Sequence, residues 1–260
     1  MFRSKYLLSI ALLAVLGIPA AAQKALEKPI DQWSQKDAIQ ILNESPWTKS
    51  YQSLAGSAAA SQAEALRAQS DNSLTGAERG RSERFGAPAP LIMRLHSGLP
   101  IRLALVRLNQ IGANYDKMND EAKIKFNETA KPMIDCSVCQ NYYVVTLTKI
   151  ANPSGQAVEE AIFEGMTLED LKGHLWLKND KGETRQLAQF IAPKKRGDSA
   201  VFFFPRKDDK GTVLLTKENK ELMFIFDPGF LSGTNRFAYL LPKQFEFKVS
   251  KITVGDQVVF

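Results

Sequence analysis

Two cysteines form the motif with the most chemical potential in this sequence, Cys136-Ser137-Val138-Cys139, and the chain has no others. A spacing this short at a turn allows the Cα separation that a disulfide needs, and exported proteins keep such pairs oxidised. We therefore expect a structural disulfide between Cys136 and Cys139. The alternative is a redox dithiol. Thioredoxin-like enzymes place this motif at the start of a helix, whereas a predicted strand at 142–147 follows it here.

Residues that could bind a metal or a haem are too few or wrongly spaced. Covalent haem attachment needs a histidine directly after the second cysteine, where this chain has Gln140. A structural zinc site needs four ligands, and the sequence has only two histidines, His96 and His174, to add to its cysteines. We expect no metal site and no cofactor.

Sequence motifs of hydrolases and phosphate-binding enzymes are also missing. The chain has no GxSxG, HExxH or P-loop pattern. Adjacent carboxylates at Asp208-Asp209 and Glu159-Glu160 are explained by a solvated turn and a solvated helix surface. We expect no catalytic residue, although a glycosidase pair could still form from carboxylates on distant strands.

The composition is that of a globular protein that does not bind nucleic acid. The chain has 260 residues, of which 44% are hydrophobic and 24% charged, and it lacks a collagen-like or cysteine-rich pattern. Its net charge of +6 is mild, and acidic residues are interspersed among the basic ones. The densest basic run, Lys194-Lys195-Arg196, would release too few counterions for tight nucleic-acid binding.

The first residues have the layout of a secretory signal peptide. Arg3 and Lys5 precede an apolar run at 6–18, and the small residues Ala20-Ala21-Ala22 follow Pro19. We expect cleavage near Gln23, a periplasmic or secreted protein, and no integral membrane span after cleavage. An uncleaved anchor is the alternative.

A short amphipathic helix follows the predicted cleavage site. Ser34 and Asp37 form a capping box, and Pro46 ends the helix. We expect its apolar side to dock onto the body of the protein or onto a partner. The docking residues would be Trp33, Ile41, Leu42 and Trp47.

The rest of the chain predicts a linker, a helical hairpin and a β-rich region. Few large apolar residues occur at 51–90, too few to offset the entropy of ordering that segment. Helical spacing at 100–112 and 115–130 predicts a hairpin, with Asn114 capping the second helix and Pro132 ending it.

Short strand patterns recur from residue 142 onward. They are 142–147, 173–178, 183–191, 199–204, 212–215, 221–226, 236–241, 245–248 and 252–260, with a helical piece at 158–172 capped by Thr167 and Asp170. A hairpin turn is expected at 179–182. This spacing favours an antiparallel β-sandwich, and the absence of later crossover helices argues against a parallel sheet.

These patterns predict an α+β fold with an N-terminal short helix and disordered linker, a helical hairpin, and then an antiparallel β-sandwich. The expected segments are a signal peptide (1–22), an N-terminal amphipathic helix segment (23–50), a flexible linker (51–90), a helical hairpin (91–139) and a β-sandwich domain (140–260).

Several motifs together resemble a known family. They are Trp33, Asp37-Ala38, Ile41-Leu42, Ser45-Pro46-Trp47, Pro100-Ile101-Arg102, the cysteine pair with Tyr142-Tyr143-Val144-Val145-Thr146-Leu147, and Phe202-Phe203-Phe204-Pro205-Arg206. The chain resembles an uncharacterised family of exported proteins from soil bacteria of the acidobacterial kind. The resemblance covers most of the chain outside the linker. It implies export and a shared fold, and it supplies no activity, substrate or catalytic residue.

The sequence therefore favours an exported, non-catalytic structural or binding module of the bacterial cell envelope. Its partner would be an unidentified envelope protein or glycan. The alternative is an envelope enzyme, either a dithiol oxidoreductase that uses Cys136 and Cys139 or a hydrolase with dispersed carboxylates.

Overall fold

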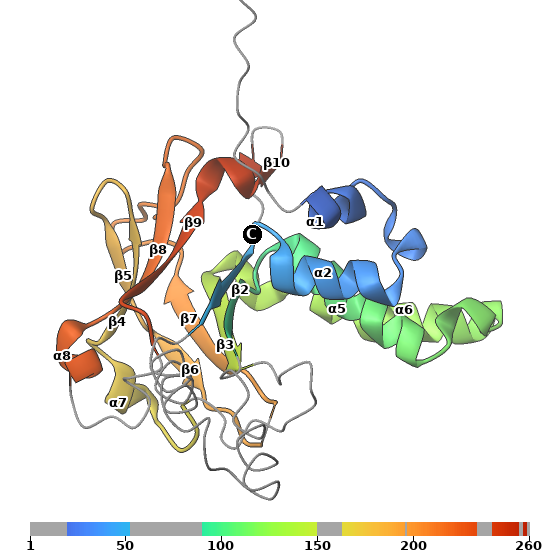
Figure 1. The fold of residues 1–260 in the computed structure, drawn as a ribbon, viewed down its shortest axis with the longest axis horizontal. Coiled ribbons are helices and arrows are strands. Elements are labelled where there is room, and N and C mark those ends of the chain that lie inside the picture. The colour runs from blue at the N-terminus through green and yellow to red at the C-terminus, as the bar shows by residue number, and fades with distance from the viewer. Residues whose placement is uncertain are drawn as a thin grey trace, which may run out of the picture.

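Two antiparallel β-sheets form the body of the molecule, and a group of helices packs beside one of them (Figure 1). The computed structural model describes residues 20–52, 90–149, 163–195, 197–232, 241–254 and 257–258. This arrangement confirms the predicted α+β fold and its sandwich-like pair of sheets. Most of the expected signal peptide and nearly all of the expected linker lie outside the described residues, as do the predicted strand at 236–240 and the helical piece at 158–162.

The first sheet has five strands in the order β1-β2-β3-β7-β6. Their bounds are Thr48–Tyr51 (β1), Leu91–Leu95 (β2), Tyr142–Lys149 (β3), Gln189–Ile191 (β6) and Ala200–Pro205 (β7). β1 pairs with β2, and β2 pairs in turn with β3. The sheet therefore includes two strands that precede the range 140–260 expected for the sandwich. These strands join it because Leu91, Met93 and Leu95 are buried in the common core.

The second sheet has the order β5-β4-β8-β9. Its strands are Leu175–Asn179 (β4), Thr184–Gln186 (β5), Glu221–Phe226 (β8) and Gln244–Lys248 (β9), and a separate pair is formed by Thr253–Val254 (β10) and Gln257–Val258 (β11). β8 alternates between half-buried and buried residues. The predicted alternation in β9 is confirmed, because Phe245 and Phe247 are buried between more exposed neighbours.

Aromatic rings fill the space between the two sheets. Phe202 and Phe204 of the first sheet contact Phe224 of the second, with ring centroids 5.3 and 5.5 Å apart in edge-on geometry. Such edge-to-face pairs stabilise a core beyond the contribution of buried area. Phe163 and Phe226 stack with their ring centroids 6.5 Å apart and belong to the same hydrophobic cluster.

Two of the predicted strands are wrong in detail. The segment 183–191 is divided between β5 in the second sheet and β6 in the first, because the chain crosses between sheets at the buried Leu187. The segment 212–215 forms only an isolated bridge between Val213 and Lys207. Leu214 in this segment is buried. The segment is therefore an apolar loop that packs on the core, and its apolar residues resemble those of a strand.

Short helices occur at both ends of the described chain and between the strands. Their bounds are Ala20–Leu26 (α1), Ile30–Gln32 (η1), Gln35–Glu44 (α2), Leu99–Gly112 (α5), Tyr115–Lys117 (η2), Asp120–Asp135 (α6), Ser137–Gln140 (η3), Leu168–Leu171 (α7), Pro228–Ser232 (α8) and Val249–Lys251 (η5). The predicted capping boxes are confirmed at Ser34 with Asp37 and at Thr167 with Asp170.

The second helix of the predicted hairpin has different ends from those expected. Its N-cap is Asn119, which accepts a hydrogen bond from the amide of Ala122 at 2.9 Å, whereas Asn114 adopts a left-handed conformation before η2. Pro132 lies inside α6 and does not end it. A proline inside a helix has no amide N–H to donate to the carbonyl four residues earlier. Here that carbonyl belongs to Glu128, which is exposed, so water can donate to it instead.

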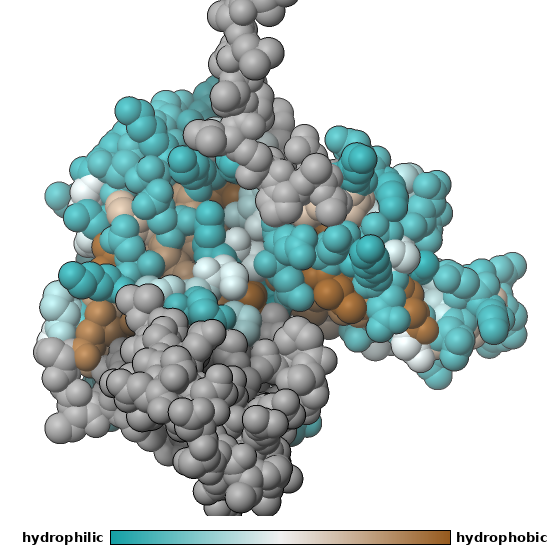
Figure 2. Space-filling view, viewed as in Figure 1, coloured by the Kyte–Doolittle hydropathy of each residue, from teal (hydrophilic) through white to brown (hydrophobic). Residues whose placement is uncertain are grey.

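α6 extends away from the sheets as part of a helical arm with α2 and α5 (Figure 1). None of its residues is fully buried. Figure 2 shows polar residues over most of this face of the molecule, with hydrophobic surface gathered on the helical side and near α8. Ile124 and Met133 are exposed apolar side chains of α6.

Candidate functional site

The residues predicted to dock the N-terminal helix are buried within this chain. Trp33, Ile41, Leu42 and Trp47 belong to the main hydrophobic cluster together with the strand residues of β2 and β3. Ile41 is completely inaccessible to solvent. Of the two docking modes left open by the sequence, the structure shows docking onto the body of the same chain. These four side chains therefore do not form a surface for a partner.

Cys136 and Cys139 form the predicted disulfide, with their Cα atoms 5.2 Å apart. Both residues are buried against Val144 and Phe203 on the outer face of the first sheet, the face directed away from the second sheet. The disulfide turn thus covers one end of that outer face and joins α6 to β3. A bond of this kind is typical of proteins outside the cytoplasm.

The surroundings of the disulfide favour a structural role. Cys136 is the C-cap of α6, where the helix dipole is negative and disfavours a thiolate. The amide of Cys136 donates to the carbonyl of Pro132 at 3.0 Å, and Nε of Arg206 donates to the carbonyl of Cys139 at 2.6 Å. These bonds fix the backbone of the turn on both sides of the disulfide.

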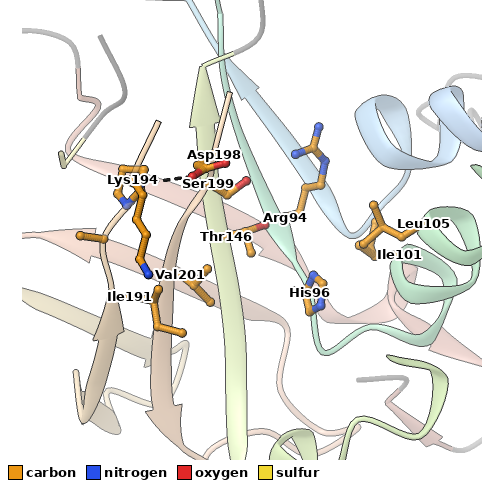
Figure 3. Close-up of a pocket in the computed structure, with 12 residues that line it drawn as sticks. Arg94, His96, Ile101, Leu105, Thr146, Ile191, Lys194, Asp198, Ser199 and Val201 are labelled. Carbon is orange, nitrogen blue, oxygen red and sulfur yellow. Dashed lines mark hydrogen bonds between the residues drawn. The ribbon is translucent and has the colours of Figure 1, made fainter. Parts of the chain in front are cut away.

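Beside the disulfide turn, the outer face of the first sheet holds a cavity of about 390 Å³ (Figure 3). Its floor is a row of residues paired directly across four strands: Arg94, Thr146, Val201 and Ile191. Ile101 and Leu105 of α5 line one side, and five residues between β6 and β7 line the other: Ala192, Pro193, Lys194, Asp198 and Ser199. We call this cavity the sheet groove. Its volume lies within the range of small-molecule sites.

His96 lines the sheet groove just beyond the end of β2. Within the described parts of the chain, its imidazole ring makes no hydrogen bond. Burial lowers the pKa of His96, and the positive charges of Arg102 and Arg94 lower it further. The ring is therefore neutral at pH 7, with one N–H group available to donate and one nitrogen available to accept.

Arg94 is half-buried and binds the end of α2. Its Nε donates to the carbonyl of Leu42 at 2.6 Å, and its Nη2 donates to Oδ1 of Asn43 at 2.9 Å. In Figure 3 the guanidinium points from the groove toward α2. Burial lowers the pKa of Arg94 to about 10, so the side chain stays charged at neutral pH. The cation at a helix C-terminus is stabilised by the helix dipole.

The loop between β6 and β7 is held by a carboxylate. Asp198 accepts hydrogen bonds from the backbone amides of Lys194 and Lys195, both at 3.2 Å. The side chain of Lys194 extends along the groove toward Ile191 (Figure 3). The only carboxylate that lines the described groove is therefore engaged by its own loop, while cationic side chains border the cavity.

The groove contains the residue types of a hydrolytic triad without their geometry. Asp198 and Ser199 lie beside Thr146, whereas His96 lies at the opposite end of the cavity (Figure 3). A nucleophile and its base must be within hydrogen-bond reach. The described groove residues therefore offer a binding surface with apolar and polar parts, and no assembled nucleophile and base.

The predicted absence of a metal stays a prediction for the chain as a whole. In the part that the structure describes, no three histidine, cysteine or carboxylate side chains lie close enough together to hold a metal ion. Within the same residues, no helix has both the length and the apolar character to cross a membrane.

Comparison with known proteins adds no assignment: no protein-family model, no curated protein and no solved structure matches this chain. The resemblance to the acidobacterial family stays a prediction. Sequence reasoning missed the sheet groove because its floor joins residues of four strands that are far apart in the chain. The one local signal was the alternation of Arg94 and His96 around the buried Leu95.

Proposed function

We propose that this protein is an exported, non-catalytic binding module of the bacterial cell envelope, and that the sheet groove is its ligand site. The observation that carries the proposal is a cavity lined in part by apolar side chains, with a histidine whose ring makes no hydrogen bond within the described chain. Polar groups that stand among apolar side chains in a pocket orient a bound ligand.

The disulfide supports export. It lies in a buried turn at a helix C-terminus, where it stabilises the fold and where a reactive thiolate is disfavoured. Export is tested by expressing the full chain with its own leader and sequencing the N-terminus of the periplasmic protein. We expect a start near Gln23. A protein that keeps Met1 and sediments with membranes would contradict cleavage.

Binding at the groove is tested without assuming the ligand. The exported protein is incubated with a total envelope extract and analysed by native mass spectrometry, beside a Val201→Trp variant whose indole fills the groove floor. We expect bound mass on the wild type that is absent from the variant. Circular dichroism establishes that the variant is folded. Equal adducts on both proteins, or none on either, would contradict binding at this site.

A further inference from the structure

We propose that the ligand of the sheet groove is a small amphiphilic anion, with a carboxylate or phosphate head group at His96 and a hydrocarbon chain along the groove floor. This inference rests on the proposed binding function and adds the chemical class of the ligand. It follows from three observations: the apolar side chains that line part of the groove, the positive charge around His96, and the unbonded imidazole.

Four large apolar side chains line the groove. Val201 and Ile191 continue the floor from β3 to the edge strand β6, opposite Ile101 and Leu105 of α5. Ile191 leaves 52% of its surface exposed, although it lies in a strand. The whole row from Arg94 to Ile191 spans roughly 14 Å at the usual strand spacing. An alkyl chain that enters from the His96 end can pass over Thr146 to Val201 and cover Ile191.

The head-group end of the groove is positively charged. Arg102 is only 5% exposed, and it donates to the carbonyls of Ser97 and Ile134. Arg94 contributes a second positive charge near His96. The exposed Asp135, which interacts electrostatically with Arg102, lies outside the groove lining. A positive potential in a partly desolvated site attracts an anion more strongly than the same charges do in water.

His96 explains why the head group belongs at this end. The positive charges that disfavour protonation of the imidazole favour a negative group beside it. The neutral ring still has one N–H, which a carboxylate or phosphate oxygen can accept. At the other end, Lys194 and Asp198 both line the groove, so their charges offset each other and that end attracts an anion less than the end at His96 does. The polarity of the groove therefore gives the ligand one orientation.

The first experiment compares ligands on the purified mature protein by isothermal titration calorimetry. The probes are decanoate, decyl phosphate, decanol and hexanoate. We expect both decyl anions to bind at least tenfold more tightly than decanol. From hexanoate to decanoate we expect affinity to rise by up to about fourfold per methylene, as complete burial of each CH₂ group predicts. The stronger of the two anions identifies the head group.

The second experiment locates the ligand with variants. His96→Phe removes the N–H donor and should weaken decanoate binding by about tenfold, the effect of one hydrogen bond to a charged group, whereas decanol, whose hydroxyl is uncharged, should lose less affinity. His96→Gln keeps a donor and should restore most of the affinity. Ile191→Ser should weaken decanoate and decanol alike. Val213→Ser removes a comparably exposed apolar residue outside the groove and should change neither.

Two results would overturn the inference. In the first, decanol binds to the wild type as tightly as decanoate does. In the second, the His96→Phe variant binds decanoate with the same affinity as the wild type. If the probes fail but the envelope extract yields a ligand that Val201→Trp excludes, the ligand class is wrong and the groove remains the site. If both experiments fail, the proposed binding function is wrong as well.

Discussion

At the scale of single residues, several buried or half-buried arginines donate hydrogen bonds to backbone carbonyls. The acceptors are Leu42 for Arg94, Ser97 and Ile134 for Arg102, Trp33 for Arg107, and Cys139 for Arg206. Carbonyls at helix ends have no partner within the helix, and the planar guanidinium can reach two of them at once. Each arginine therefore joins segments that are distant in sequence.

Arg102→Lys should lower the free energy of unfolding by about 1–3 kcal/mol. The compact ammonium cannot donate to the carbonyls of Ser97 and Ile134 together, so one of them stays buried without a partner. Urea unfolding measures the loss. Lys131→Arg, at an exposed position of α6, serves as the control and should stay within about 0.5 kcal/mol of the wild type. If Arg102→Lys changed the free energy of unfolding as little as the control does, the proposed role of Arg102 in joining the segments at Ser97 and Ile134 would be contradicted.

His96 should make the protein less stable in mild acid. Because its pKa is lowered in the folded state, the unfolded chain takes up a proton near pH 6.5 that the folded chain does not yet bind. The free energy of unfolding should therefore fall as the pH drops from 7 toward 5, and His96→Gln should remove that part of the decline. Denaturant titrations of both proteins across this range test it; identical slopes would refute it.

Carboxylates contribute to acid sensitivity in a different range. Hydrogen bonds from Ser34 lower the pKa of Asp37, and hydrogen bonds from Thr167 lower that of Asp170. Stability from these groups is present above the ordinary carboxyl pKa, 3.8, and is lost as the pH falls below it. Their effect therefore does not overlap the effect of His96.

At the scale of elements, Gly98 sets how closely α5 approaches Trp47. A Cβ atom at this position would lie 2.4 Å from Cδ1 of Trp47 and 3.0 Å from the carbonyl oxygen of Leu95. Gly98→Ala should therefore lower stability by about 1–3 kcal/mol. Gly112→Ala is the matched control, since nothing lies within 4 Å of its Cβ and alanine favours the helix. Thermal unfolding should move in opposite directions for the two variants.

The disulfide should stabilise the joint between α6 and β3. The double variant Cys136→Ser, Cys139→Ser should lose about 2 kcal/mol of unfolding free energy, the amount expected for so short a loop. Reducing the wild type should reproduce the loss. Turnover of a disulfide substrate by the wild type, abolished in the variant, would instead favour the dithiol oxidoreductase.

Element boundaries were predictable where the signals were local. Both capping boxes occupy four consecutive residues, so the sequence reveals them completely. The start of α6 was ambiguous, because Asn114 and Asn119 are equally good caps and only the intervening turn η2 distinguishes them. The division of 183–191 depends on which sheet each half joins, and no local pattern encodes that choice.

At the scale of the whole molecule, the N-terminal helix is part of the core. Deletion of residues 28–47 should abolish cooperative unfolding, because it removes Trp33, Ile41, Leu42 and Trp47 from the main cluster. Trp47→Ala alone should cost about 3–5 kcal/mol. Near-ultraviolet circular dichroism and denaturant unfolding measure both effects. A deletion variant as stable as the wild type would show that the helix is dispensable.

The global fold was predictable, and the candidate site was not. Alternation such as that of Phe245 and Phe247 requires one buried sheet face, and its repetition at turn-separated intervals indicates a sandwich. The disulfide was predictable from the spacing of the two cysteines together with the expected export. The sheet groove depends on four strands and on α5 meeting in space. Its polarity depends on arginines whose neighbours only the tertiary structure determines.

Because β1 pairs directly with β2, the length of the connection between these two strands is only weakly constrained. Tyr51 and Leu91 are direct partners, so residues 52–90 leave the sheet and return to it at the same place. Shortening such an excursion tenfold changes the closure entropy by only about 2 kcal/mol. Closure entropy therefore places little constraint on the length of the chain that connects these two strands. On this entropic ground the connection is a candidate insertion point for a foreign domain.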